Sequence, residues 1–237
     1  MKFPYNCVLV VDTETANTIT EPLPYDISYA IIDINTQEVL SSHAFVVAEI
    51  YLDKDLMNTA YYAKKIPLYE RDLASGKRTL ARLSTIQRTI TAEMEKYNVE
   101  AVGAYNMNFD KRALNKDERL ITSSKYRWFF PYGTQFFCIW SMACSSILRS
   151  KRFIQWAIDN ACVSACGNIQ TSAEVAYRYI TKDLDFNEDH MGLEDVAIET
   201  EILFKILQSG MRFTLEPSPA CWRQTQNRRK ELEFEIA

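Results

Sequence analysis

The sequence predicts an α/β fold in which a mixed β-sheet is flanked by helices. Short apolar runs rich in β-branched residues occur early in the chain, and such runs are typical of buried strands. Further along, strand-like and helix-like segments alternate, and from Phe153 onward the pattern is mainly helical. Strands first, followed by strands that alternate with helices, indicate one sheet covered by helices.

Three strands are expected near the N-terminus. Cys7–Val11 is a short apolar run, as in a buried strand. Ile27–Ile34 and Val39–Val47 are predicted as two further strands, separated by a turn-like stretch at residues 33–36. Together these segments predict an antiparallel meander.

An amphipathic helix is expected next, because apolar residues recur there at steps of three and four positions. This apolar stripe consists of Leu80, Leu83, Ile86, Ile90, Met94 and Tyr97. Ala101–Tyr105 is then predicted as a short buried strand, Phe109–Leu114 as the start of a helix, and Gln135–Ile139 as a fifth strand. Helices over Ala173–Ile180 and Leu193–Gln208 complete the predicted elements.

Composition places the chain among ordinary globular proteins, with 47% apolar and 24% charged residues. We expect one domain over residues 1–210. Gly210 suits the end of its last helix, and a polar C-terminal tail is expected over residues 211–237. The net charge of −4 argues against a simple nucleic-acid binder, which is usually basic. It does not argue against an acidic site that binds divalent cations.

A cytoplasmic location without membrane association is expected. The N-terminus has no secretory pattern, and no apolar stretch approaches the length of a membrane span. Six cysteines in such a chain are expected to be reduced thiols. Cys162 and Cys166 have zinc-type spacing, but the chain has only two histidines and no second close cysteine pair, which disfavours a structural zinc.

Asp12 and Glu14 lie at the end of the first predicted strand. Side chains at positions i and i+2 of a strand project to the same face, so both carboxylates are expected to point the same way. Two hard oxygen ligands at a strand end suit Mg²⁺ or Mn²⁺. The alternative is a solvated acidic turn.

Asp110 follows the predicted strand Ala101–Tyr105 and opens a helix. Asn106 precedes it by four positions, and Phe109 is expected to anchor the helix in the core. An aspartate in this position can bind a metal, or it can simply satisfy the free amides and the dipole at the helix N-terminus. Taken alone, the motif leaves both alternatives open.

His190 and Asp195 stand at the entrance of the last long predicted helix. Asp195 can turn toward the apolar face that contains Val196 and Leu203 only if something compensates its buried charge, and a metal ion would do so. The imidazole of His190 titrates near neutral pH, which suits proton transfer from a water molecule. A lone histidine is more often structural.

The ordered segments VVDTET, AYNMNFDKRAL and HMGLEDVAIETEIL resemble the three exonuclease motifs of the DEDD superfamily. The spacing H-x-x-x-x-D between His190 and Asp195 resembles the histidine-type branch, which includes DnaQ-like proofreading subunits, RNase T and oligoribonuclease. A tyrosine-type member would carry tyrosine where this chain has Met191. The resemblance implies a ribonuclease-H-like fold with a central five-stranded mixed sheet. Residues 50–79 and 128–169 match less readily and are expected to be family-variable insertions.

The resemblance also implies an activity, that of a 3′→5′ exonuclease. Such an enzyme hydrolyses phosphodiester bonds with two divalent cations, Mg²⁺ or Mn²⁺, and releases nucleoside monophosphates. Asp12 would bridge both cations. Glu14 and Asp195 would complete the site on the attacking side, and Asp110 would help to hold the second cation. His190 would be the general base that accepts a proton from the attacking water.

The implied substrate is DNA or RNA with a free 3′ end, in single-stranded form. Thr13, Thr15 and Asn106 are the expected substrate contacts. An oligoribonuclease-like hydrolase of short oligonucleotides and a non-catalytic nucleic-acid-binding module stay open as alternatives, although the module should have lost a motif residue. Members of this branch are often homodimers, and no residue here decides that point or the choice between DNA and RNA.

Two further groups of residues have a structural and a functional interpretation. Basic residues outnumber acids around one predicted helix and could contact substrate phosphates or form a solvated face: Lys64, Lys65, Arg71, Lys77, Arg78, Arg82 and Arg88. An aromatic cluster could stack on bases or pack in the core: Trp128, Phe129, Phe130, Tyr132, Phe136 and Phe137. The structural interpretation is favoured for both groups.

Overall fold

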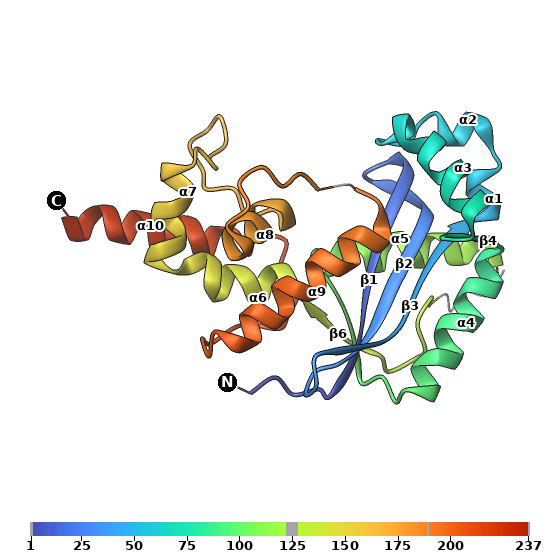
Figure 1. Ribbon diagram of the computed structural model, residues 1–237, viewed down its shortest axis with the longest axis horizontal. Helices are drawn as coiled ribbons and strands as arrows, with labels where there is room; N and C mark the ends of the chain where they lie inside the picture. The colour runs from blue at the N-terminus through green and yellow to red at the C-terminus, as the bar shows by residue number, and fades with distance from the viewer. Residues whose placement is uncertain (1, 122–127, 189, 237) are drawn as a thin grey trace.

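The computed structural model describes residues 2–121, 128–188 and 190–236, and its centre is a mixed β-sheet (Figure 1). The sheet has six strands in the order β4-β3-β2-β1-β5-β6. The strands are β1 (Cys7–Thr18), β2 (Glu21–Asp33), β3 (Glu38–Val47), β4 (Thr79–Ala81), β5 (Ala101–Ala104) and β6 (Gln135–Cys138). The first three pair antiparallel, as the predicted meander requires, and the other three join in parallel. The fold class is confirmed, but the expected number of five strands is wrong for the described residues.

The additional strand is β4, which the sequence analysis had assigned to a helix. Leu80 pairs with Val46 of β3, and helix α4 (Leu83–Lys96) begins only after it. The carboxylate of Glu49 accepts a hydrogen bond from the backbone N–H of Leu83 at 3.0 Å and so caps the helix from a distant part of the chain. A strand of three residues is too short to show alternation, and the spacing of Leu80 happened to match the helical stripe.

Strand β1 runs well beyond the predicted segment Cys7–Val11, because the polar residues that follow also pair with β2 as far as Thr18. Its parallel partner β5 reaches only to a position beside Val10. From there on, within the described residues, the β5 side of β1 has no strand partner. Asp12 and Glu14 therefore lie inside the strand and not at its end, at the place where one side of the strand becomes open.

Helices cover both faces of this sheet (Figure 1). The helices of the described residues are α1 (Ala48–Tyr51), α2 (Lys54–Met57), η1 (Ala63–Lys65), α3 (Ile66–Ser75), α4 (Leu83–Lys96), α5 (Met107–Ile121), α6 (Ile139–Ser145), η2 (Ile147–Arg149), α7 (Lys151–Asp159), α8 (Ala173–Thr181), α9 (Gly192–Gln208) and α10 (Arg223–Ile236). Val8 and Val10 of β1 enter the core that includes α9, whereas Leu9 and Val11 enter the core that includes α4 and α5. None of the helices, as far as their residues are described, is both long and apolar enough to cross a membrane.

The C-terminal part contains the two predicted helices as α8 and α9, and Gly210 follows α9 with a φ of 67°. Residues 211–237, expected as a polar tail, include helix α10. Gln226 of this helix donates to the carbonyl of Ile169 at 2.9 Å and accepts from its N–H at 3.0 Å. The segment is therefore attached to the body of the protein. The division into a domain and a tail stays a prediction.

Asp26 of β2 is a buried carboxylate that accepts four hydrogen bonds. Its Oδ2 atom accepts from Arg78 Nη1 at 2.5 Å and from Tyr69 Oη at 2.7 Å. The same atom accepts from the backbone N–H of Gly192 at 3.2 Å, and Oδ1 accepts from Ser28 at 2.8 Å. These bonds join β2 to α3, to the residues before β4 and to the first residue of α9.

Arg78 extends this network and has a fully buried side chain. Its Nη2 atom donates to Glu194 in the first turn of α9 at 2.9 Å, and its Nε atom lies 3.5 Å from Asp72. The interpretation of Arg78 as a surface cation is wrong, because three acids compensate its charge inside the protein. Gly192 is needed here, since a Cβ atom at that position would lie 2.9 Å from the hydroxyl oxygen of Ser28.

We expect Arg78→Met to lower the free energy of unfolding by about 3–5 kcal/mol, because Asp26 would keep a buried charge without its partner. Equilibrium unfolding in urea measures the loss. Arg71→Met is the matched control, since Arg71 pairs with Asp72 from a mostly exposed side chain and should contribute less than about 1 kcal/mol. Equal losses in the two variants would contradict a special role for the buried pair.

Candidate active site

Asp12 and Glu14 point to the same face of β1, as their spacing predicted. In the antiparallel ladder Asp12 lies opposite Ser28 and Glu14 opposite Asp26. The register shifts directly after Glu14, which marks a β-bulge. Both carboxylates therefore stand beside the buried network that holds the start of α9.

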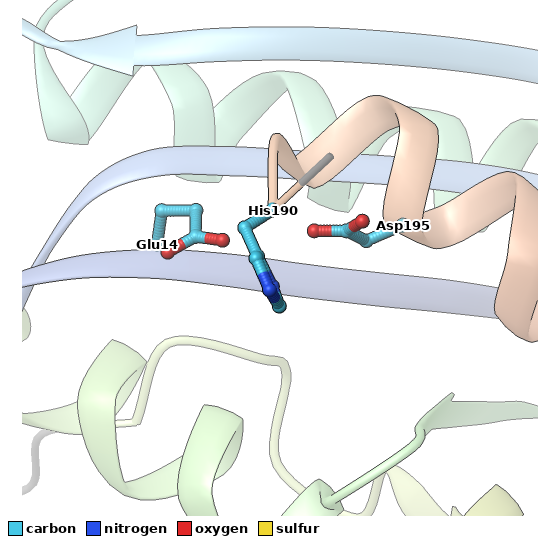
Figure 2. A group of neighbouring side chains, drawn as sticks. All are labelled: Glu14, His190 and Asp195. Carbon is cyan, nitrogen blue, oxygen red and sulfur yellow. The ribbon is translucent and has the colours of Figure 1, made fainter. Parts of the chain in front are cut away.

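Glu14, His190 and Asp195 come together at this place. One ligand atom from each residue lies within 4.8 Å of the other two. Figure 2 shows the carboxylates of Glu14 and Asp195 pointing toward each other, with His190 beside them on the segment that leads into α9. Residues far apart in the sequence thus form one group of possible metal ligands.

Asp110 reaches the site from the first turn of α5. Its Oδ1 atom accepts a hydrogen bond from the hydroxyl of Thr13 at 2.9 Å, and both side chains are buried. Asp12, Thr13, Asn106 and Asp110 line one cleft of about 330 Å³. Besides burial, the charges of Asp195, Asp110 and Glu14 each raise the pKa of Asp12, so the two groups of residues are neighbours beside β1.

The three expected substrate contacts differ in position. Thr13 is buried, and its hydroxyl already bonds to Asp110. Thr15 is partly exposed, and Asn106 is exposed and lines the cleft. The carbonyl of Asn106 accepts a hydrogen bond from the N–H of Phe109 at 2.8 Å in the first turn of α5. Their contact with a substrate stays a prediction.

Two further acids in the site were not singled out from the sequence. Glu199 is 4% exposed, lines the same cleft and accepts a hydrogen bond from the backbone N–H of Tyr105 at 2.9 Å. Glu188 also lines the cleft, and its Oε2 atom lies 3.8 Å from Nδ1 of His190. Glu199 could have been found, because it stands four residues after Asp195 and hence on the same side of α9.

Burial dominates the electrostatics of these acids. Together with the charges of Asp195 and Asp26, burial raises the pKa of Glu14 to about 9. Burial and neighbouring acids likewise raise the pKa of Asp195 to about 8. Lys65 opposes both shifts. Burial raises the pKa of Asp110 to about 7, although the hydrogen bond from Thr13 lowers it.

The innermost carboxylates suit a divalent cation. Burial raises the pKa of both Asp12 and Glu199 well above the usual range, and the charge of Glu199 adds to the shift of Asp12. Among the described residues, Asp12 Oδ2 and Asp195 Oδ1 are buried oxygen atoms without a hydrogen-bond partner. Hard oxygen donors that lack partners are the ligands that Mg²⁺ and Mn²⁺ prefer. The residues present therefore fit such cations.

His190 also contacts an aromatic ring. Its ring stacks on Tyr62, with centroids 4.4 Å apart and planes at 12°. Its backbone has a φ of 47°, a left-handed conformation that is uncommon outside glycine. His43, the second histidine in the sequence, lies in β3, and its ring bonds to Glu93 at 3.1 Å.

The aromatic cluster is divided between core and surface. Phe129, Phe130 and Phe137 are buried in the two cores, as the structural interpretation expected. Trp128 is 55% and Tyr132 is 98% exposed. Phe136 is partly buried and packs against one of these cores. The packing interpretation is therefore confirmed for the four phenylalanines and not for Trp128 and Tyr132.

Solved structures of nucleases share this fold, although sequence comparison alone finds no matching family model and no matching curated protein. The nuclease domain of 3′hExo, a DEDDh family member bound to rAMP, superposes with a TM-score of 0.57 at 13% identity. The matched region covers 91% of this chain and 98% of that domain. Cell-death related nuclease 4 (CRN-4) gives a TM-score of 0.54 at 11% identity. The matched region covers 90% of this chain and 67% of that nuclease.

Escherichia coli exonuclease I in complex with a dT13 oligonucleotide gives a TM-score of 0.50 at 14% identity. This chain covers 41% of that protein, and 86% of this chain is matched. At such identities the likeness shows the fold. The ribonuclease-H-like fold of the DEDDh exonucleases, which the sequence motifs implied, is thereby confirmed.

The raised pKa values predict how stability depends on pH. The folded protein holds protons on Glu14 and Asp195 that the unfolded chain releases near pH 4. In chelator, the melting temperature should therefore fall as the pH rises from about 5 to 9. Added Mg²⁺ or Mn²⁺ should raise it, and more so at high pH, because cations compete with these protons.

Differential scanning calorimetry with and without cation tests this expectation. Asp195→Asn removes one titrating ligand, so its melting temperature in chelator should depend less on pH and its response to cation should shrink. A wild-type melting temperature that changes with neither pH nor added cation would contradict the proposed origin of the pKa shifts.

Proposed function

We propose that the protein is a metal-dependent 3′→5′ exonuclease of the DEDD superfamily, in the histidine-type branch. One observation carries the proposal: a histidine and carboxylates from all three motifs meet around one strand of a ribonuclease-H-like sheet. A non-catalytic relative would have no need to retain four mutually repelling acids in a buried site, because burial without cations costs stability.

Neighbours of the same fold support a nucleic-acid substrate. One is bound to rAMP, another is described as recognising the 3′ end of a histone mRNA stem-loop, and a third holds a dT13 oligonucleotide. We therefore propose a polynucleotide with a free 3′ end as the substrate. A panel of 3′- and 5′-labelled DNA and RNA, single- and double-stranded, with Mg²⁺, Mn²⁺ or chelator, would identify the preferred polymer.

The proposed cation ligands are Asp12, Glu14 and Asp195 on one side, and Asp12 with Asp110 on the other. Two bound cations would activate the attacking water and stabilise the charge on the leaving oxygen. Thr13 fixes one oxygen of Asp110 by its hydrogen bond at 2.9 Å. Asp110 is thus oriented before any substrate binds.

His190 is the proposed general base. Its imidazole would accept the proton of the attacking water, and this requires the neutral ring. Nδ1 faces Glu188 Oε2 at 3.8 Å, so Nε2 is the proposed acceptor, and the carboxylate of Glu188 would stabilise the imidazolium that forms. Glu14 and Asp195 stand within reach of the same ring.

The proposal predicts the polarity of cleavage. Mononucleotides should be released from the end that carries a 3′-hydroxyl, and a blocked 3′ end should protect the strand. Gel analysis of 5′-labelled single strands, with and without a 3′ block, measures this. Circular single strands provide the control, and their efficient cleavage would indicate an endonuclease.

A second prediction separates the metal ligands from the base. Asp12→Ala should lose both cation binding and turnover, because Asp12 is proposed to contact both cations. His190→Ala should still bind cations, as measured by calorimetry, but should lose about 10²–10⁴-fold in rate, the range typical of general-base catalysis. His43→Ala is the control, since His43 bonds to Glu93 outside the site. Loss of turnover in His43→Ala with normal turnover in His190→Ala would refute the assignment.

A further inference from the structure

Tyr62 contacts the proposed base face to face. The rings of Tyr62 and His190 lie 4.4 Å apart between centroids, with planes at 12°. Tyr62 is the N-cap residue of η1, within residues 50–79, whereas His190 precedes α9. A segment that carries no motif residue therefore supplies a direct neighbour of the imidazole.

The position of Tyr62 is fixed through the segment that follows it. The exposed ring of Tyr61 touches Tyr62 only edge-on, with centroids 4.8 Å apart and planes at 87°. Lys65 Nζ lies 5.0 Å from the centroid of the Tyr62 ring. The short helix η1 continues into α3, where Tyr69 donates to the buried carboxylate of Asp26. The position of Tyr62 is thus tied to β2 and, through the same carboxylate, to the start of α9.

The face contact suits a role in orienting the imidazole. The side chain of His190 is 34% exposed. The carboxylate of Glu188 lies 3.8 Å from Nδ1, beyond hydrogen-bond distance. A broad contact between parallel rings restricts the tilt of the ring directly.

Tyr62 is not a second candidate for the base. Burial, followed by the nearby charge of Glu14, raises the pKa of its hydroxyl far above the ordinary value. The phenol therefore keeps its proton at physiological pH and accepts none from water. Any effect of Tyr62 on turnover must then pass through its contacts.

On the premise that His190 is the general base, we infer that Tyr62 is a positioning residue that holds the imidazole plane in its orientation toward Glu14 and Asp195. The proton-accepting chemistry stays with His190, and the aromatic ring of Tyr62 supplies the support. The hydroxyl group of Tyr62 has no part in this role. A phenylalanine should therefore replace it.

Steady-state kinetics of three variants test the inference. Tyr62→Ala should lower kcat by about 10- to 100-fold through misplacement of the base, with KM nearly unchanged. Tyr62→Phe should restore the wild-type kcat. Tyr61→Ala is the matched control, because Tyr61 is 86% exposed and touches Tyr62 only by its edge. It should behave like the wild type.

Nuclear magnetic resonance of the full chain gives a readout that needs no activity. The sequence has two histidines. The ring signals of His190 should shift in Tyr62→Ala and stay in place in Tyr62→Phe, because the face of an aromatic ring shields nearby nuclei. The signals of His43, bonded to Glu93 in β3, should not move in either variant.

The outcomes distinguish this inference from the function on which it rests. If the wild type is active and Tyr62→Ala has an unchanged kcat or unchanged ring signals of His190, the positioning role alone is overturned. A raised KM with unchanged kcat also overturns it, in favour of a substrate contact. Equal loss of kcat in Tyr61→Ala would assign the effect to the whole segment. An inactive wild type on every substrate of the panel refutes the proposed function itself.

Discussion

The ion pair between Asp26 and Arg78 is the interaction on which the rest of the site depends. Asp26 lies across from Glu14, and the same carboxylate oxygen that accepts from Arg78 also accepts from the backbone N–H of Gly192. One buried carboxylate therefore sets the distance between β1–β2 and the start of α9. A buried pair adds little net stability over an apolar pair, but it strongly disfavours any arrangement that separates its charges. The main effect of the pair here is to fix the position of α9 relative to β1 and β2.

A second constraint is the repulsion among the acids of the cleft. Arg78 compensates Asp26, yet the charge of Asp26 still contributes to the raised pKa of both Glu14 and Asp195. Such a cluster lowers the stability of the folded protein wherever its members are ionised, and the well-packed cores on both faces of the sheet compensate for it. The site thus combines a rigid support with a local loss of folding stability, which cation binding would remove.

Local patterns were sufficient for much of the fold and the site. Asp12 and Glu14 share a face because a strand has a period of two, and α9 was visible because its apolar face has a period close to 3.6. Features that depend on distant partners were not predictable. The burial of Arg78 requires Asp26, and the strand at Leu80 requires Val46. The Tyr62–His190 stack likewise joins two segments that no local pattern connects.

The open side of β1 has a consequence for behaviour at high protein concentration. A strand whose backbone groups face no neighbouring strand can pair with another chain and begin aggregation. Beyond Val10, the β5 side of β1 has no strand partner within the described residues. The first turn of α5 lies against this part of β1, where Asp110 accepts a hydrogen bond from Thr13, and Val11 and Thr13 are buried. A strand edge that a helix covers is poorly accessible to a second chain. Substitutions that detach the start of α5 from β1 should therefore favour aggregation.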